Sequence, residues 1–200
     1  MSMDVRQMEK NTARTNGTEA KHSFLSDIRE IRERARKHVS DGAVTPSYGA
    51  DRDTVLRLLN EALATELVCV LRYRRHYFMA NGAVGELIKG ELLKHAKEEQ
   101  GHADVIAERI VQLGGEPDFN PMGITDRSHA EYIEGSSLSD MVREDLVAER
   151  IAIESYTEMI RYIGDKDTTT KRMLEGILAV EEEHAEELAS MLETLSGDRA

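Results

Sequence analysis

Several residue types are scarce in this 200-residue chain, and each scarcity excludes a class of structure. Tryptophan is absent, aromatic residues make up 4% of the chain and there are three prolines, while Ala, Leu, Glu and Arg are abundant. This balance disfavours sheet and favours helix. The single cysteine, Cys69, cannot form an internal disulfide, and we expect it to be a small buried hydrophobe. No apolar run approaches the roughly 20 residues of a membrane span, and the polar start at 1–21 lacks a secretory apolar segment. We therefore expect an all-α protein of the cytoplasm.

Charge is distributed unevenly along the chain. The net charge is −12, yet residues 1–40 carry nine Lys or Arg against six Asp or Glu, so the remainder holds about −15. An acidic body repels nucleic acid and attracts metal cations. The basic residues of 29–37 alternate with acidic ones, which favours a solvated helix face over a nucleic-acid contact.

Apolar periodicity predicts the organisation of the chain. Residues 1–22 are polar and patternless, and we expect a flexible tail there; 23–50 should hold a short amphipathic helix (23–39) and a linker. A four-helix bundle is expected over 51–195, followed by a short tail at 196–200. Apolar residues at steps of three and four place its helices at about 53–80, 84–113, 138–163 and 174–195. The aperiodic stretch 116–137 is long enough to cross the bundle, which predicts two antiparallel hairpins joined by a crossover.

The two halves of the bundle carry the same pattern of ligand-type residues. A glutamate on one helix is followed, 33 or 32 residues later, by a Glu-x-x-His on the next helix. These residues are Glu66, Glu99 and His102 in the first half, and Glu149, Glu181 and His184 in the second. Tyr73 follows Glu66 by seven residues, and Tyr156 follows Glu149 by seven. The two halves therefore share three features: the first glutamate, the tyrosine and the Glu-x-x-His. A single Glu-x-x-His is weak evidence, because one also occurs by chance in the polar tail, at Glu19 and His22. Two copies within apolar, periodic helix faces are much stronger evidence for a metal site.

Periodicity turns these six residues inward, where four unpaired carboxylates would be costly. Two divalent cations would balance the four negative charges, with the imidazoles as neutral ligands. Oxygen-rich ligation with one imidazole per metal and no thiolate suits iron or manganese better than structural zinc, and iron is our first choice. The alternative is that these are ordinary exposed glutamates of an acidic bundle. The sequence does not decide whether His95 is a core residue, a support for a ligand or a ligand itself. Glu182 and Glu183 are expected to be solvated.

Three stretches resemble the corresponding helices of bacterioferritins, within the ferritin-like superfamily. They are LNEALATELVCVLRYRRHY, KEEQGHADVIAERIVQLGG and LAVEEEHAEELASML, and the likeness covers about residues 51–195. It implies a ferritin-like four-helix bundle, a dinuclear ferroxidase centre where iron(II) is oxidised by O2 or H2O2, and mineral storage in a hollow shell. By motif, it implies that Glu99 and Glu181 bridge the two irons and that Tyr73 sits beside the centre. The terminal ligands would be Glu66 and Glu149, with His102 and His184 completing each iron.

Two departures from the bacterioferritin pattern matter. The family's haem-binding methionine follows the first bridging glutamate, and here Gln100 stands in that place, so haem is not predicted. The chain also ends a few residues after Leu195, so we do not expect the short fifth helix that 24-subunit shells of the family have. The expected assembly is therefore a homo-oligomeric shell of 12 or 24 subunits, the smaller being of the Dps type. The helix at 23–39 is expected to pack on a neighbouring subunit or cover a pore.

Two other classes of function remain open. A diiron or dimanganese redox enzyme, such as a rubrerythrin-like peroxidase or a manganese catalase, uses a similar ligand set without storing mineral. The Cys-x-x-Cys domain typical of rubrerythrins is absent from this one-cysteine chain. A DNA-associated stress protein that uses the basic arm at residues 1–40 is the other alternative.

Overall fold

The computed structural model describes residues 27–197, which are helical wherever they are regular and contain no strand. Its elements are α1 (Ile28–Lys37), α2 (Arg52–Met79), α3 (Gly82–Gln112), α4 (Ile124–Arg127), α5 (Leu138–Ile163), a 3-10 turn (Gly164–Lys166) and α6 (Thr168–Gly197). The expected flexible tail at 1–22 lies outside the described residues. Among the described helices, none combines the length and apolarity that a membrane span needs.

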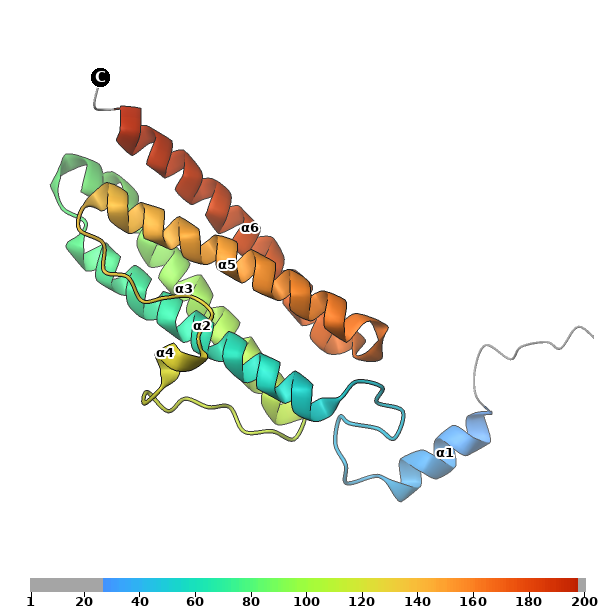
Figure 1. Cartoon of the computed structure of the whole chain (residues 1–200). Helices are drawn as coiled ribbons and strands as arrows, with labels where there is room; N and C mark the ends of the chain where they lie inside the picture. The colour runs from blue at the N-terminus through green and yellow to red at the C-terminus, as the bar shows by residue number, and fades with distance from the viewer. Residues whose placement is uncertain (1–26, 198–200) are drawn as a thin grey trace, which may run out of the picture. The chain divides into compact units, whose positions relative to one another are not determined.

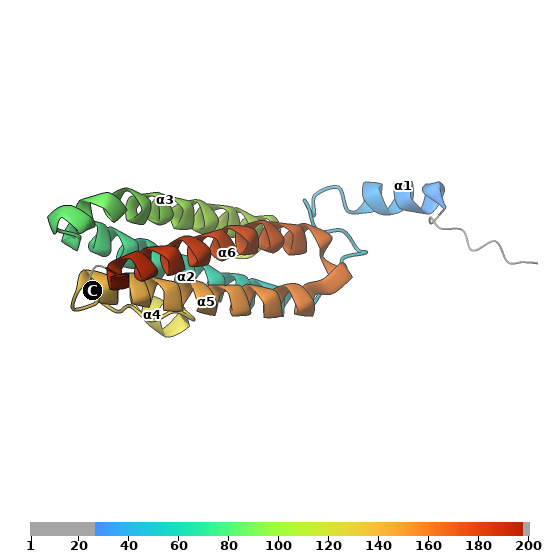
Figure 2. The ribbon, with the colours of Figure 1, turned by 90° about the horizontal axis from the view of Figure 1, so that it is seen from above.

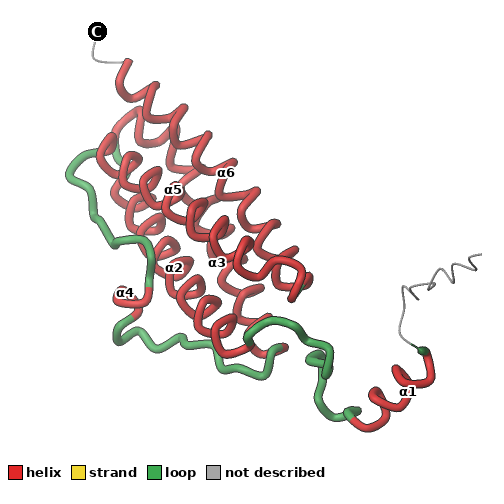
Figure 3. The backbone as a smooth tube through the Cα atoms, turned by 45° about the vertical axis from the view of Figure 1, so that its right-hand side comes forward, coloured by secondary structure: helices red, strands yellow, loops and turns green. Residues whose placement is uncertain are grey.

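The four long helices form two antiparallel hairpins, α2 with α3 and α5 with α6 (Figure 1). The connection from α3 to α5 runs back along the bundle and carries α4, as the loop tracing in Figure 3 shows. As a result α3 and α5 run in the same direction, and so do α2 and α6 (Figure 2). The predicted four-helix bundle with a long crossover is confirmed.

Local signals set the helix ends. Asp51 accepts a hydrogen bond from the backbone N–H of Thr54 at 2.9 Å and begins α2. The turn between α2 and α3 uses Gly82 at φ 81°, a left-handed conformation that favours glycine. Asp167 accepts from the backbone N–H of Thr170 at 2.9 Å, so α6 begins six residues before the apolar stripe that starts at Leu174. Capping rather than burial decides that start.

Helix α1 belongs to a unit that is separate from the bundle, with the division between Val39 and Ser40. Asp27 caps it by accepting from the backbone N–H of Arg29 at 2.8 Å. None of its residues is buried; Ile28 is 55% exposed. The predicted amphipathic helix is confirmed for residues 28–37, and residues 23–26 of the prediction lie outside the described part of the chain.

Two apolar clusters fill the bundle, one toward each end. One gathers residues 55–63 of α2, 103–113 of α3, 152–163 of α5 and 174–177 of α6. The other gathers 69–80, 92–96, 142–148 and 188, together with Ala130 of the crossover. In every long helix the two clusters leave the same central gap, at 66, 99–102, 149 and 181–184. The predicted ligand residues therefore occupy a polar layer between two apolar ones.

Some expectations were wrong in detail. The apolar steps of three and four that predict the helix at 138–163 include Ile153 as an inward residue, but Ile153 is only partly buried, whereas Ala152 is 4% exposed. The buried line of α5 instead runs through Asp145, Glu149, Ala152 and Tyr156, because a 3.6-residue period selects those positions. The four-residue helix α4 was missed, since one turn is too short to show a period.

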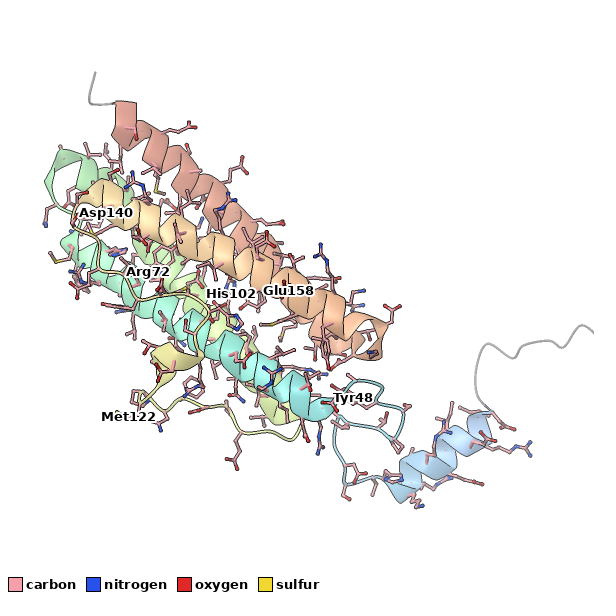
Figure 4. The ribbon with its side chains drawn as sticks, viewed as in Figure 1. Tyr48, Arg72, His102, Met122, Asp140 and Glu158 are labelled. Carbon is pink, nitrogen blue, oxygen red and sulfur yellow. The ribbon has the colours of Figure 1, made fainter. Side chains whose placement is uncertain are left out.

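A buried ionic cluster ties the crossover to the bundle. Asp145 of α5 binds Arg72 Nε at 2.9 Å and His76 Nδ1 at 2.8 Å, both from α2, and all three side chains are at most 1% exposed. Arg72 also donates to the backbone oxygen of Glu131 at 2.9 Å, and His76 Nε2 lies 3.2 Å from that of Glu134. Arg72, labelled in Figure 4, lies where the crossover meets the bundle. The cluster thus fixes α2, α5 and the crossover against one another.

Replacing Asp145 with Ala should strongly destabilise the protein, because it leaves the buried Arg72 cation without its partner. Breaking a buried pair in this way costs about 3–5 kcal/mol, which lowers the melting temperature of a chain of this size by roughly 10 °C. Melting curves at a fixed protein concentration measure the shift. Glu144→Ala removes the same charge one residue earlier, at a side chain with no bonded partner among residues 27–197, and should melt within a few degrees of wild type. Equal melting of the two variants would contradict this role for the cluster.

Candidate metal centre

Six side chains that the sequence predicts as metal ligands meet in the central polar layer of the bundle. They come from all four long helices: Glu66 from α2, Glu99 and His102 from α3, Glu149 from α5, and Glu181 and His184 from α6. Counted as whole residues, none of the six is more than 9% exposed. His102, labelled in Figure 4, lies inside the bundle near the middle of its length. The helical period, which places these positions on inward faces, accounts for the convergence.

The six residues form two sets of four, and the sets share two members. The ligand-type atoms of Glu66, Glu99, His102 and Glu181 all lie within 4.8 Å of one another. The same is true of Glu99, Glu149, Glu181 and His184. The two shared carboxylates, Glu99 and Glu181, therefore stand between two half-sites, each of which has its own glutamate and its own histidine.

In each half-site one imidazole nitrogen faces three carboxylates. His102 Nδ1 lies 2.9 Å from Glu181 Oε1, 3.4 Å from Glu66 Oε2 and 3.8 Å from Glu99 Oε2. In the other half-site, distances from His184 Nδ1 to carboxylate oxygens are 3.2 Å for Glu99, 3.5 Å for Glu181 and 4.0 Å for Glu149. The half-sites thus repeat the same arrangement on either side of the two shared glutamates, Glu99 and Glu181.

Two tyrosines cross between the halves. Tyr73 of α2 donates its hydroxyl to Oε1 of Glu149 on α5, and Tyr156 of α5 donates to Oε1 of Glu66 on α2. Both phenols are at most 2% exposed. Burial and the charge of the accepting glutamate raise the pKa of each tyrosine well above its ordinary value, so both remain hydrogen-bond donors. Each repeat therefore orients the unshared glutamate of the other.

Most of the remaining ligand-type atoms have no hydrogen-bond partner among the described residues. These atoms are Glu66 Oε2, Glu99 Oε1, both oxygens of Glu181, His102 Nδ1 and His184 Nδ1. Buried polar atoms normally find partners, and leaving one unpaired costs about 1–3 kcal/mol. Here these atoms, which form ion-pair contacts but no aligned hydrogen bonds, gather in the two sets of four. Such a donor set, of carboxylate oxygens with one imidazole per set and no thiolate, fits a pair of iron or manganese ions.

The carboxylates of the cluster differ in acidity. Burial and the neighbouring charge of Glu99 raise the pKa of Glu66 to about 8. Burial and the charges of Glu99 and Glu181 raise the pKa of Glu149 well above its ordinary value. Burial also acts to raise the pKa of the two shared residues, Glu99 and Glu181. Contacts with both histidines, and with Glu66 for Glu99 or Glu149 for Glu181, outweigh burial, so the pKa of each falls below its ordinary value.

The histidines are held in the charged form. Burial disfavours the imidazolium of His102, but the surrounding carboxylates, Glu181 first, outweigh it and raise the pKa of His102 to about 12. The same balance raises the pKa of His184 to about 10. With Glu66 and Glu149 in the neutral form that their raised pKa values favour, two charged carboxylates and two imidazolium ions give the six side chains no net charge. Protons supply the compensation that divalent ions would otherwise provide.

His95 lies outside the two sets of four but belongs to two smaller groups of candidate ligand atoms, one with Glu98 and His184 and one with Glu91 and Glu187. Its imidazole is fully buried, stacks on the ring of His184 at a centroid distance of 4.0 Å, and places Nε2 2.7 Å from Glu187 Oε2. His95 therefore supports His184 from outside the two sets of four. His184 Nε2 in turn lies 2.8 Å from Glu98 Oε2. The sequence reasoning missed Glu98 and Glu187, because both look like ordinary surface glutamates; their positions beside Glu99 and three residues after His184 were the only signal.

The other residues singled out in the sequence lie away from the ligand set. Glu182 and Glu183 are exposed, as expected. Cys69 is 3% exposed in the second apolar cluster, where it packs as a small hydrophobe. Gln100, at the position of the family's haem ligand, is exposed on α3 and donates to Asp104 at 2.9 Å.

Comparison with known proteins agrees with this architecture. The ferritin-like domain family matches residues 56–197. A bacterioferritin of Mycobacterium bovis is 31% identical over 142 residues, or 70% of this chain and 85% of that protein. A DNA protection during starvation protein of Pyrococcus furiosus is 32% identical over 140 residues, or 68% of this chain and 75% of that protein.

A solved structure covers still more of the chain. The dodecameric thioferritin of Bacteroides fragilis, described as bacterioferritin-related, matches with a TM-score of 0.72 and 27% identity over 86% of this chain and 96% of that one. The helix order, the long crossover and the sequence relatives lead to the same conclusion. This chain belongs to the ferritin-like family.

Proposed function

We propose that the protein stores iron by oxidising iron(II) at the paired half-sites and depositing the ferric product in a homo-oligomeric shell. The observation that carries this proposal is the sharing of Glu99 and Glu181 by two sets of four buried ligand-type residues. Two carboxylates placed between two metal positions hold both ions close together, which suits removal of one electron from each. Bacterioferritin relatives at about 31% identity support the iron-storage role.

The proposed reaction balances with either oxidant. Two iron(II) ions give up one electron each, and O2 accepts the two electrons with two protons to form H2O2. With H2O2 as the oxidant, two electrons and two protons yield two molecules of water. Transfer of the electrons as a pair avoids a one-electron radical. The chain supplies geometry and charge compensation: four glutamates balance two divalent ions, and Tyr73 and Tyr156 hold the unshared glutamates in place.

We propose twelve subunits as the size of the shell. The Bacteroides fragilis protein, whose structure matches 86% of this chain, is named as a dodecamer. Structures of Dps proteins from Thermosynechococcus elongatus and Bacillus brevis share the fold as well. A closed shell would confine the ferric product, and the acidic character of residues 41–200 would attract iron(II) to it.

Sedimentation of the whole protein before and after aerobic addition of many iron(II) equivalents per chain tests the proposal, with iron oxidation followed by absorbance. A hollow assembly that oxidises the iron and then sediments faster with a mineral load is the expected result, and its mass decides between 12 and 24 subunits. A small oligomer that binds about two metals per chain and never mineralises would overturn storage. It would point instead to a non-storage diiron or dimanganese redox enzyme.

A further inference from the structure

The two half-sites repeat one another in their ligands but not in the residues that surround the ligands. On α3, His95 lies four residues before Glu99, and Glu98 lies one residue before it. On α6, the corresponding positions before Glu181 are Ile177 and Val180. On α6, Glu187 follows the ligand histidine by three residues, and Val105 has that place on α3. The three polar residues His95, Glu98 and Glu187 thus have apolar counterparts in the other half of the repeat. All three lie next to His184 or next to a residue that contacts it.

These polar residues hold His184 in place. The His184 Nε2–H donates to Glu98 Oε2 at 2.8 Å, because an ionised carboxylate can only accept. When a metal ion replaces the Nδ1 proton of His184, donation from Nε2 keeps the form in which the Nδ1 lone pair faces the glutamates. His95 stacks on the same ring with an angle of 23° between the planes. Glu187 fixes His95 in turn, and Lys94 Nζ lies 3.2 Å from Glu187. The imidazole of His184 is therefore held at its edge and on its face.

His102 has no comparable support within the described residues. No hydrogen bond from its Nε2 to a described side chain or backbone group is present, and its side chain is 11% exposed against 1% for His184. Ile177, the counterpart of His95, is 3% exposed and packs in the first apolar cluster instead. The His102 imidazole is held only on its Nδ1 side, where it faces the carboxylates, so metal binding must supply more of its ordering, and that ordering opposes binding.

We propose that the two half-sites are unequal by construction, and that Glu98 is the positioning residue responsible. The half-site of Glu149 and His184 takes the first divalent ion and holds it more tightly. The half-site of Glu66 and His102 binds the second ion more weakly and exchanges it more readily. This inference rests on the proposed dinuclear site and adds an order of filling to it. Carboxylates hydrogen-bonded to ligand histidines typically change metal affinity about 10–100-fold, and we expect a difference of that size.

Binding of cobalt(II) under anaerobic conditions tests the order in which the half-sites fill, because no metal is oxidised during the measurement. Calorimetry and the visible absorption of bound cobalt(II) report affinity and ligand geometry in the full-length assembly. Glu66→Gln leaves only the His184 half-site complete, and Glu149→Gln leaves only the His102 half-site. Each substitution keeps the side-chain volume and an oxygen to accept from its tyrosine. We expect E66Q to bind one ion about 10–100-fold more tightly than E149Q binds its one.

Glu98→Ala then identifies the cause. In the E66Q background it should weaken binding about 10-fold or more, and in the E149Q background it should change nothing. Glu182→Ala removes the same charge from an exposed position beside Glu181 and serves as the control; it should leave both affinities unchanged. Equal affinities of E66Q and E149Q, or an equal loss on adding Glu98→Ala to each, would overturn the inference. Such results leave the dinuclear site intact, whereas a wild-type protein that binds no pair of ions would refute the proposed function itself.

Discussion

Replacing Glu99 with Gln should abolish rapid iron oxidation while leaving the bundle folded. Glu99 belongs to both sets of four, so one substitution removes a ligand from both half-sites. Loss of a residue that only supports a ligand costs about 10–100-fold in affinity or activity, and loss of a shared ligand should cost more. We therefore expect the initial rate of iron(II) oxidation to fall by about 100-fold or more, measured by absorbance at saturating oxygen.

The folded state of the Glu99→Gln variant can be tested without any catalysis. Because Glu99 is paired with the charged imidazole of His184 at 3.2 Å, its replacement should lower the melting temperature in the absence of metal, while the apolar clusters keep the bundle folded. Adding cobalt(II) at about 100 times its dissociation constant should stabilise wild type by about 2.7 kcal/mol, and the variant should gain almost nothing. Glu182→Gln, at an exposed position next to Glu181, is the matched control and should oxidise iron normally. An oxidation rate in Glu99→Gln equal to that of wild type would refute the site assignment.

Binding of two divalent ions should release about four protons per chain at pH 7. Glu66, with a pKa of about 8, holds a proton at this pH, and burial together with the charges of Glu99 and Glu181 raises the pKa of Glu149 and favours its protonated form as well. His102 and His184, with pKa values of about 12 and 10, hold one each. All four must leave before four carboxylates and two neutral imidazoles can bind the ions. Since protons compete with metal, affinity should fall steeply as the pH drops below about 8, the pKa of Glu66.

Calorimetric titration with cobalt(II) in buffers of different ionisation enthalpy counts the released protons directly. Glu66→Gln, which leaves one complete half-site, should bind one ion and release about two protons, those of Glu149 and His184. Release of two protons or fewer by the wild-type protein would show that the histidines are neutral at pH 7 and that the charge balance described above is wrong.

The sequence was most informative where burial follows helical periodicity. The four long helices, the long connection between them and the inward placement of all six ligand-type residues follow from apolar steps of three and four. The roles of these six residues as ligands remain a prediction, although the structure brings their donor atoms together. The repeat of 33 and 32 residues could be recognised because each half of the chain encodes one hairpin.

Other features could not be read from the sequence, because they depend on which helices cross and in which direction. Tyr73 was expected beside the centre, but only the antiparallel packing of α2 on α5 shows that it serves the glutamate of the other half. Arg72 and Asp145 look like ordinary surface charges, and 73 residues separate them in sequence; the tertiary structure buries both and pairs them.

The sequence by itself determined the fold class, the two hairpins and the set of residues that line the centre, because helical period and apolar pattern are local properties. Only the tertiary structure decided how those residues divide between two half-sites and which outer residues support them. Glu98 and Val180 occupy matching places in the repeat, yet only Glu98 reaches a ligand histidine, at 2.8 Å. Contacts between helices depend on three-dimensional packing, and that packing makes an almost symmetric sequence into an asymmetric site.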